Sequence, residues 1–333
     1  MPLIGGHRKA LYRTSASRRV HRRRLTRGLI LTAALMATSL VAAGSVYVGS
    51  ASYKTNRPEA VSAPQAAAKK RPPRVKKEPV NIVIVGETPR NGIGTAATDR
   101  VMVLHIDKDR KSAAILSFPS NTYVPVAGRR WNTIGAAYED GGIKLTVKTL
   151  DKLLGTKMDH SAVATQEGFL ALSQQVGTIN VNNPKAFTSV GYTFARGRIT
   201  LSGLEVLAYV RGSGTDVAGD QANRQQLVIE AGIRKQLSGD LLSSPAKLAA
   251  FIDAASEHLT VDKALTPTRL ATIAFSLDIT ESDVSVITVP LSSEVKLVKG
   301  LPVRKVDPVL FPELVDALDA DRLDDYLAAH PNP

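Results

Sequence analysis

Apolar runs of strand length dominate the chain directly after Val80. Residues 81–86, 101–106 and 113–118 are nearly continuous apolar runs, and the polar stretch DKDRK separates the second from the third. Short apolar runs with polar or glycine boundaries are typical of buried strands, and a short polar stretch between two of them predicts a hairpin. The first run ends at Gly86, which is typical of a strand whose end faces a ligand.

Helical spacing replaces the strand pattern in the segments that follow. Apolar residues recur every three or four positions between Gly141-Gly142 and Gly155, so a helix is predicted there. A capping-box sequence at Ser202–Glu205 and an aspartate at position 220 each predict a helix start. Further helices are expected near 245–258, 266–276 and 311–326, with a strand over 284–289. The alternation predicts one α/β body without an internal repeat or a clean boundary between two domains.

The first 79 residues differ from this body in composition. Residues 8–27 are dense in arginine, residues 28–50 carry no charge, and residues 51–79 are rich in alanine, proline and lysine. An uncharged run of about 20 residues can cross a bilayer, and its basic flank is expected to stay in the cytoplasm. The sequence therefore predicts a cytoplasmic tail over 1–27, a retained transmembrane helix over 28–50, an extracytoplasmic linker over 51–79 and a domain over 80–333. The linker is either a soluble spacer or a tether that attracts anionic wall polymer.

Charge, cysteine content and motif content exclude several function classes. The net charge is +13, but residues 1–79 hold 17 basic and two acidic residues, which leaves 26 basic and 28 acidic residues for the rest. A nearly neutral domain does not favour nucleic acid, so no nucleic-acid partner is expected. The absence of cysteine excludes disulfides, cysteine-ligated zinc and a thiol nucleophile. No P-loop, GxSxG or HExxH sequence is present, and His105, inside an apolar run, is expected to be a packed histidine rather than a base.

Charged residues at strand ends and helix starts are the candidates for chemistry. Glu87 follows the first strand and Asp99 precedes the second, and two carboxylates at one sheet edge suit Mg²⁺ together with phosphate oxygens. By spacing alone, solvated loop acids are the simpler interpretation of this pair. Arg211 ends one helix and Arg224-Gln225 lies in the first turns of the next, where free N–H groups favour a phosphate. An intrahelical salt bridge is the alternative for Arg224.

The order of several segments is that of a known family. The segments TDRVMVLHID, ILSFPSNTYVPV, IGAAYEDGGIKLTVKTLDKLLG, MDHSAVATQEGFLALSQQVGTINV, ITLSGLEVLAYVRG and NRQQLVIEA follow one another from about Val80 onward. In order and spacing they resemble the LytR-CpsA-Psr family. The resemblance implies a three-layer α/β/α sandwich around a mixed central sheet, preceded by one transmembrane helix. It further implies an extracytoplasmic, membrane-anchored phosphotransferase that uses arginines and Mg²⁺ to bind a polyprenyl-pyrophosphate-linked glycopolymer and transfers it to peptidoglycan.

The chain departs from the family pattern at several arginines. The family turn Pro-Arg-Asp-Thr reads Pro119-Ser120-Asn121-Thr122 here, so Ser120 and Asn121 occupy substrate-binding positions without the arginine. The other departures are Gly86-Glu87 for Gly-Ser/Thr-Asp, Ala97-Thr98-Asp99 for Arg-Ser-Asp, Ser213 for the second arginine of Tyr-Val-Arg-x-Arg, and Gln221 for an arginine before Arg224-Gln225-Gln226. The resemblance thus leaves Arg211 and Arg224 as catalytic residues that also bind substrate with Gln225, and Glu87 and Asp99 as metal ligands. A contact with a charged group is worth about 1.5–3 kcal/mol, so two uncompensated losses would cost about 10²–10⁴ in binding or rate.

Three hypotheses follow from these departures. The first is a working transferase with a rearranged arginine set, in which Arg100, Arg129 or Arg130 could replace a lost arginine. The second is a relative that binds the lipid-linked intermediate or wall polymer without turnover. The third is a membrane-tethered regulator that uses its basic tail on DNA, but residues 1–27 are too few to form a packed reading domain.

Overall fold

The fold is organised around a six-stranded mixed sheet. The computed structural model describes residues 78–88, 97–165, 177–212, 220–238, 259–279, 283–298 and 300–330. The strand order is β11-β6-β1-β2-β3-β12, with β1–β2, β2–β3 and β6–β11 antiparallel and β1–β6 and β3–β12 parallel. These strands are β1 Val80–Thr88, β2 Ala97–Ile106, β3 Ala113–Pro119, β6 His160–Ala164, β11 Leu259–Val261 and β12 Val284–Thr288. The predicted α/β class and mixed central sheet are confirmed.

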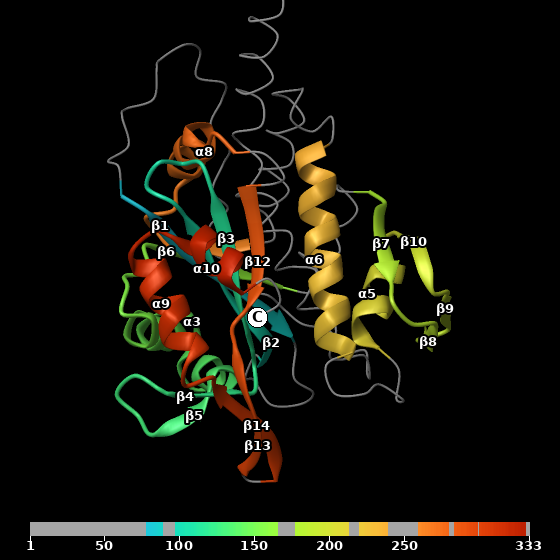
Figure 1. Cartoon of the computed structure of the whole chain (residues 1–333), viewed down its shortest axis with the longest axis horizontal. Helices are drawn as coiled ribbons and strands as arrows, with labels where there is room; N and C mark the ends of the chain where they lie inside the picture. The colour runs from blue at the N-terminus through green and yellow to red at the C-terminus, as the bar shows by residue number, and fades with distance from the viewer. Residues whose placement is uncertain are drawn as a thin grey trace, which may run out of the picture.

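Three smaller sheets extend this core. One has the order β13-β14-β4-β5, and the other two are the pairs β7–β10 and β8–β9. Their strands are β4 Thr122–Pro125, β5 Trp131–Thr133, β7 Ile179–Asn183, β8 Phe187–Ser189, β9 Tyr192–Phe194, β10 Gly197–Leu201, β13 Leu291–Val298 and β14 Leu301–Val306. The described helices are α3 Ile134–Leu154, α5 Leu204–Arg211, α6 Asp220–Ser238, α8 Pro267–Ser276, α9 Leu310–Asp319 and α10 Leu323–Ala329. In Figure 1, α8 and the β13–β14 hairpin lie at opposite ends of the molecule.

Helices cover both faces of the central sheet. On one face, Ile82 and Met102 pack in a cluster with residues of α6 and α8, including Ile229 and Ile273. On the other face, Val83, Val101 and neighbouring apolar residues pack with residues of α3, α9 and α10. Because successive side chains of a strand point to opposite faces, a strand buried on both faces is apolar at nearly every position. This explains the continuous apolar runs of β1, β2 and β3.

Two helix predictions differ from the structure. The helix expected after Gly141-Gly142 begins earlier, at Ile134, where the Thr133 side chain accepts a hydrogen bond of 3.1 Å from the Ala136 N–H and caps the helix. Gly142, with φ 58°, instead marks a kink inside α3. The single closing helix expected near 311–326 is two helices, α9 and α10, separated at Asp321, whose φ is also 58°.

The capping box at the start of α5 is only half formed. The Glu205 carboxylate accepts hydrogen bonds from the Ser202 N–H at 3.0 Å and from the Ser202 hydroxyl at 3.1 Å. The serine hydroxyl therefore bonds the glutamate instead of a helix N–H.

Several predictions lie outside the described residues. These are the tail, transmembrane helix and linker over 1–77, and the helix near 245–258. Among the helices in the described ranges, none is both long enough and apolar enough to cross a bilayer.

Candidate functional site

The ends of β1 and β2 bring the two predicted metal ligands close together along the backbone. Glu87 pairs with Thr98 across the antiparallel ladder, and a bulge interrupts the register between Val85 and Glu87. Asp99 follows Thr98 directly, and its side chain lies outside the described part of the structure. Bulges are common next to functional sites because they change the direction of a side chain. The strand register therefore places the backbones of the two residues next to each other.

Tyr138 of α3 holds the Glu87 carboxylate. Its hydroxyl donates a hydrogen bond of 3.3 Å to Glu87 Oε2, and Tyr138 itself is buried. Burial, and then the charge of Glu87 and this hydrogen bond, raise the pKa of the Tyr138 hydroxyl well above its usual value. The tyrosine therefore stays protonated and acts as a donor that orients Glu87, not as a base.

The turn after β3 is fixed by two other elements. The Ser120 carbonyl accepts a hydrogen bond of 2.9 Å from the Gly135 N–H at the start of α3. A Cβ at Gly135 would lie 3.0 Å from both the Cβ and the carbonyl oxygen of Ser120, so any larger residue would push the turn back by a few tenths of an ångström. The Asn121 side chain donates to the Pro302 carbonyl at 3.3 Å, and the Asn121 carbonyl accepts from the Arg304 N–H at 3.3 Å. Both predicted substrate-binding residues thus belong to a rigid turn.

Arg100 connects the end of β3 to α6. Its Nη1 donates to the Ser117 hydroxyl at 2.6 Å, and its Nε and Nη2 donate to Gln225 Oε1 at 3.2 and 2.9 Å. Arg100 is 3% exposed and pairs with Pro119, the residue before the turn. The arginine considered as a replacement ligand therefore supports Gln225 directly.

The other two arginines considered as replacements lie on the surface. Arg129 forms an ion pair of 2.8 Å with Asp140, and both side chains are about half exposed. Arg130 is exposed, next to β5.

Arg224 lies between α5 and α6. Its Nε donates to the Tyr209 carbonyl at 2.8 Å, and its guanidinium lies 4.5 Å from the centroid of the Phe187 ring. These contacts join α6 to α5 and β8. Burial raises the pKa of Tyr209 to about 12, against the opposing charge of Arg224, and the Tyr209 hydroxyl donates to Asn183 at 3.1 Å.

The end of α5 is thereby held next to the start of α6. The Nε bond from Arg224 reaches the carbonyl two residues before Arg211, whose own side chain lies outside the described residues. Arg224 and Gln225 are each 4% exposed, so a ligand that contacts them has to enter the fold.

The donors present are compatible with Mg²⁺. Mg²⁺ is usually bound by one or two carboxylates, with phosphate oxygens and water completing an octahedron. The backbones of Glu87 and Asp99, the two residues predicted as ligands, lie at one end of the sheet. Within the described ranges, no group of three or more histidine or acidic side chains has metal-binding geometry. The residues thus fit a metal that is shared with a phosphate ligand.

A hollow of about 500 Å³ lies between α6 and the β7–β10 pair. Its lining includes Arg198, Arg234, Lys235 and Ala231. This basic, mixed lining does not suit the hydrocarbon chain of a lipid.

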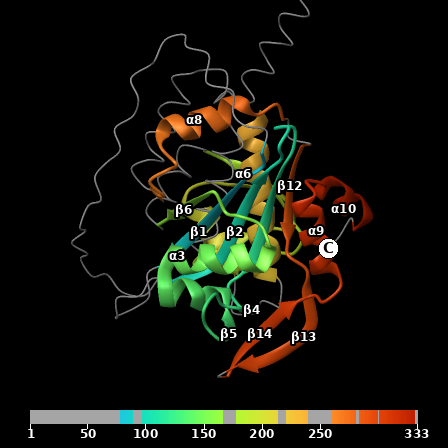
Figure 2. The same ribbon diagram turned by 90° about the vertical axis from the view of Figure 1, so that its left-hand side faces the viewer.

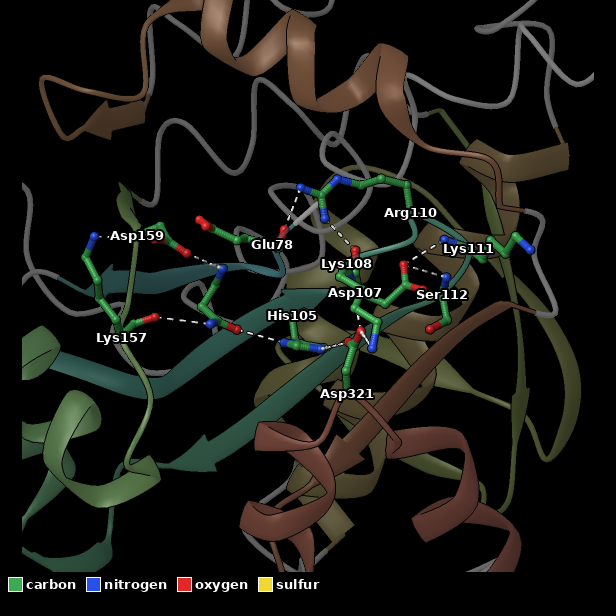
Figure 3. A network of polar contacts seen from close by, with 11 residues as sticks. Glu78, His105, Asp107, Lys108, Arg110, Lys111, Ser112, Lys157, Asp159 and Asp321 are labelled. Carbon is green, nitrogen blue, oxygen red and sulfur yellow. Dashed lines mark hydrogen bonds and ion pairs between the residues drawn. The ribbon is translucent and has the colours of Figure 1, made fainter. Parts of the chain in front are cut away.

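A polar network at the opposite end of the sheet ties distant segments together (Figure 3). His105, 3% exposed, has its Nδ1 2.8 Å from Asn81 Oδ1 and its Nε2 3.1 Å from Asp321 Oδ1. The Asn81 amide group donates to the Lys157 carbonyl at 3.1 Å, and the Lys108 N–H donates to Asp321 at 3.1 Å. The prediction that His105 is a packed core histidine is confirmed.

Sequence reasoning missed the supporting roles of Arg100 and Tyr138. An arginine within β2, directly before its apolar run, was a signal that a buried partner exists, but the sequence does not identify that partner. Tyr138 belongs to the quoted segment AAYEDGG, yet its contact with Glu87 spans 51 residues.

Comparison with known proteins gives concordant results. Residues 45–307 match the model of the LytR_cpsA_psr family. A relative from Bacillus mycoides, named polyisoprenyl-teichoic acid–peptidoglycan teichoic acid transferase TagU, is 34% identical over 172 residues, which cover 51% of this chain and 56% of the relative. A relative of the same name from Halalkalibacterium halodurans is 32% identical over 190 residues, which cover 56% of this chain and 62% of the relative. The chain thus spans little more than half the length of these curated relatives.

Solved structures agree with this family match. The crystal structure of B. subtilis TagV superposes with a TM-score of 0.63 at 25% identity, over 75% of this chain and 99% of that one. The structure described as TagT bound to LIIa-WTA has a TM-score of 0.57 at 21% identity, over 77% of this chain and 97% of that one. At this identity the match shows a shared fold.

Proposed function

The chain belongs to the LytR_cpsA_psr family, and we propose that it transfers a polyisoprenyl-pyrophosphate-linked glycopolymer of the teichoic acid class onto peptidoglycan. The relatives named TagU carry this activity in their names. The observation that supports the proposal is that three chain segments lie at one end of the sheet. These are the paired strand ends that contain Glu87 and Asp99, the Ser120–Asn121 turn, and the start of α6 held by Arg100.

The residues would divide the chemistry between them. A peptidoglycan sugar hydroxyl attacks the phosphorus next to the glycan, and polyprenyl phosphate leaves. Glu87 and Asp99 would hold Mg²⁺, which neutralises charge on the pyrophosphate oxygens as phosphoryl transfer requires. Arg211 and Arg224, with Gln225, would bind the pyrophosphate and its developing charge from the helix side. Phosphoryl transfer depends mainly on positioning the reacting groups and neutralising their charge, and the carboxylates, arginines and glutamine named above are groups of the type that this requires.

Ser120 and Asn121 would line the other flank of the pyrophosphate. No charged side chain is supplied at these two positions, so we expect a slow enzyme. The alternative is binding without turnover, which is favoured by the replaced arginines and by the commitment of Arg100 to Ser117 and Gln225.

The test is Mg²⁺-dependent release of polyprenyl phosphate by the full chain in detergent. We expect measurable release by the unmodified protein, its loss in Arg211→Ala, and a gain of about tenfold or more in Ser120→Arg/Ser213→Arg, since each contact is worth about 1.5–3 kcal/mol. Binding of the lipid by all three proteins without release would establish the binding alternative. Release that is insensitive to Arg211→Ala would refute the assigned residues.

We further propose the topology predicted from the sequence. In this topology residues 1–27 lie in the cytoplasm, 28–50 span the membrane and 51–79 form a linker. The three-layer domain over 80–333 then lies on the outer side of the membrane, where the acceptor peptidoglycan is located. A reporter that is active only in the cytoplasm, fused after Pro333, should stay silent. A strong signal from that reporter would refute this orientation.

A further inference from the structure

The β13–β14 hairpin carries exposed apolar side chains away from the body of the fold. Figures 1 and 2 both show it projecting at the end of the molecule farthest from α8. Of the seven large apolar residues exposed in the described ranges, four belong to the sheet that contains this hairpin. They are Trp131 at 48%, Val295 at 52%, Leu297 at 74% and Leu301 at 66% exposed. Such clustering marks an interaction surface, whereas scattered single residues would not.

The most exposed leucines flank the hairpin turn. Val298 and Leu301 form the last pair before the turn, and Leu297 belongs to the pair before it, with Pro302. No side chain of the described core covers them. The two leucines therefore project at the end of the hairpin and do not line a groove in the described residues.

Aromatic and basic residues lie behind this tip on the same small sheet. The rings of Tyr123 and Trp131 lie 5.6 Å apart, and Lys305 Nζ lies 5.0 Å from the centroid of the Trp131 ring. Tryptophan, tyrosine and lysine combine an apolar body with a polar end, which suits the boundary between lipid tails and headgroups.

The charges of the sheet favour a negatively charged surface. Strands β4, β5, β13 and β14 contain three basic residues, Lys296, Arg304 and Lys305, and one acidic residue, Glu294. Basic residues close to an anionic membrane surface each add to its attraction.

We propose that the hairpin tip inserts Leu297 and Leu301 into an anionic lipid bilayer, with Trp131 and Lys305 at the headgroup level. A hydroxyl-rich glycan would satisfy the lysines but offers no apolar environment to the two leucines. The lipid surface accounts for both classes of residue.

The hairpin is bonded directly to the candidate site. The Arg304 N–H and the Pro302 carbonyl both bond Asn121, the neighbour of Ser120. Insertion of the tip would hold the turn close to the headgroups, where the pyrophosphate of a lipid-linked substrate lies. The role of this membrane contact in positioning the substrate rests on the proposed function. The membrane contact itself can be tested without any transferase activity.

Trp131 is the only tryptophan of the chain, so its fluorescence reports the hairpin sheet alone. The full chain is reconstituted into vesicles of phosphatidylglycerol with phosphatidylcholine, or of phosphatidylcholine alone. Quenching by lipids brominated on the acyl chain is compared with quenching by iodide in the water. A second reporter, Trp131→Phe/Leu297→Trp, places the single tryptophan at the tip.

In the anionic vesicles we expect brominated lipid to quench both reporters, the tip reporter more strongly, and iodide access to fall several-fold. In Leu297→Asp/Leu301→Asp, followed through Trp131 fluorescence, the affinity of the hairpin tip for the bilayer should fall about tenfold or more for each leucine. The matched control is Val190→Asp, at the exposed tip of the β8–β9 hairpin (60% exposed), which should behave as the unmodified protein.

Three results would overturn the proposal. The first is iodide access to both reporters with no quenching by brominated lipid. The second is a fluorescence change produced only by added soluble peptidoglycan or teichoic acid, which would assign the surface to polymer. The third is a change that depends on protein concentration without lipid, which would assign it to a second copy of the chain. Release of polyprenyl phosphate from a short-chain, detergent-soluble substrate should survive Leu297→Asp/Leu301→Asp. Lipid contact without any release would therefore refute only the proposed function.

Discussion

Replacing Arg100 tests whether this arginine supports the site or binds the substrate. Its guanidinium donates hydrogen bonds to Ser117 and Gln225, which are 1% and 4% exposed. In Arg100→Met the side chain remains long and apolar, but both acceptors lose this donor. Each unsatisfied buried acceptor costs about 1–3 kcal/mol, which gives about 2–6 kcal/mol for the pair.

Part of that cost is offset. A buried guanidinium pays a desolvation penalty of its own, which the methionine does not, so we expect a net destabilisation of about 2–4 kcal/mol. The measurement is urea unfolding of the full chain in detergent, followed by far-UV circular dichroism. Arg129→Met is the matched control, since its ion pair with Asp140 is about half exposed and should change the free energy of unfolding by less than about 1 kcal/mol.

The Gln225 contact can be isolated with a double-mutant cycle. Gln225→Leu removes the acceptor, so Arg100→Met should cost less in that background, with a coupling energy of about 1–3 kcal/mol. Arg100→Lys keeps the charge but lacks the planar fork, and should lose most of the same stability. If Arg100→Met leaves unfolding unchanged, or if the two substitutions are additive, the supporting role is refuted. Full stability with lost lipid binding would instead make Arg100 a substrate ligand.

Three further substitutions test other parts of the structure. The hydrogen bond from His105 is the main cause that lowers the pKa of Asp321, so the stability from ionised Asp321 is present above pH about 4 and is lost as pH falls through the lowered pKa. Asp321→Asn should therefore lower the urea midpoint at pH 7, and the gap to the unmodified protein should narrow as the pH falls below about 4; a constant gap would contradict this. Tyr138→Phe should change unfolding by about 1 kcal/mol or less yet raise the Mg²⁺ concentration needed for activity, unless Glu87 is not a ligand. Gly135→Ala should displace the turn after β3 and cost about 1–3 kcal/mol, and a crystal structure with the turn unmoved would exclude that steric argument.

The sequence predicted those elements whose pattern is local. Strands β1, β2 and β3 are buried on both faces, so their apolar runs were visible without a structure. The start of α3 was not, because Gly141-Gly142 interrupts the helical spacing and the true cap, Thr133, is itself the last residue of a short strand. The break between α9 and α10 depends on Asp321, whose carboxylate contacts a histidine 216 residues earlier. Spacing along the chain carries no record of such a contact.

The long-range contacts of the candidate site were even less predictable from the sequence than the helix boundaries. Glu87 and Asp99 could be named because each lies at a strand boundary, and Arg224-Gln225 because it opens a helix. Arg100 was named only as a possible replacement for a lost arginine. Its contact with Gln225 spans 125 residues, so its supporting role became visible only when α6 was packed on the sheet.

The two ends of the central sheet have different roles, so substitutions at one end should change activity and substitutions at the other should change stability. Glu87 lies on the α3 face with Tyr138, whereas Arg100 lies on the α6 face with Gln225. A pyrophosphate that meets both groups must therefore bind across the end of the sheet and not on either face. The opposite end holds the His105 network, which fastens distant segments together (Figure 3). Substitutions in that network should consequently lower the free energy of unfolding and leave the Mg²⁺ requirement unchanged. Substitution of Tyr138 should instead raise the Mg²⁺ requirement and leave the free energy of unfolding nearly unchanged.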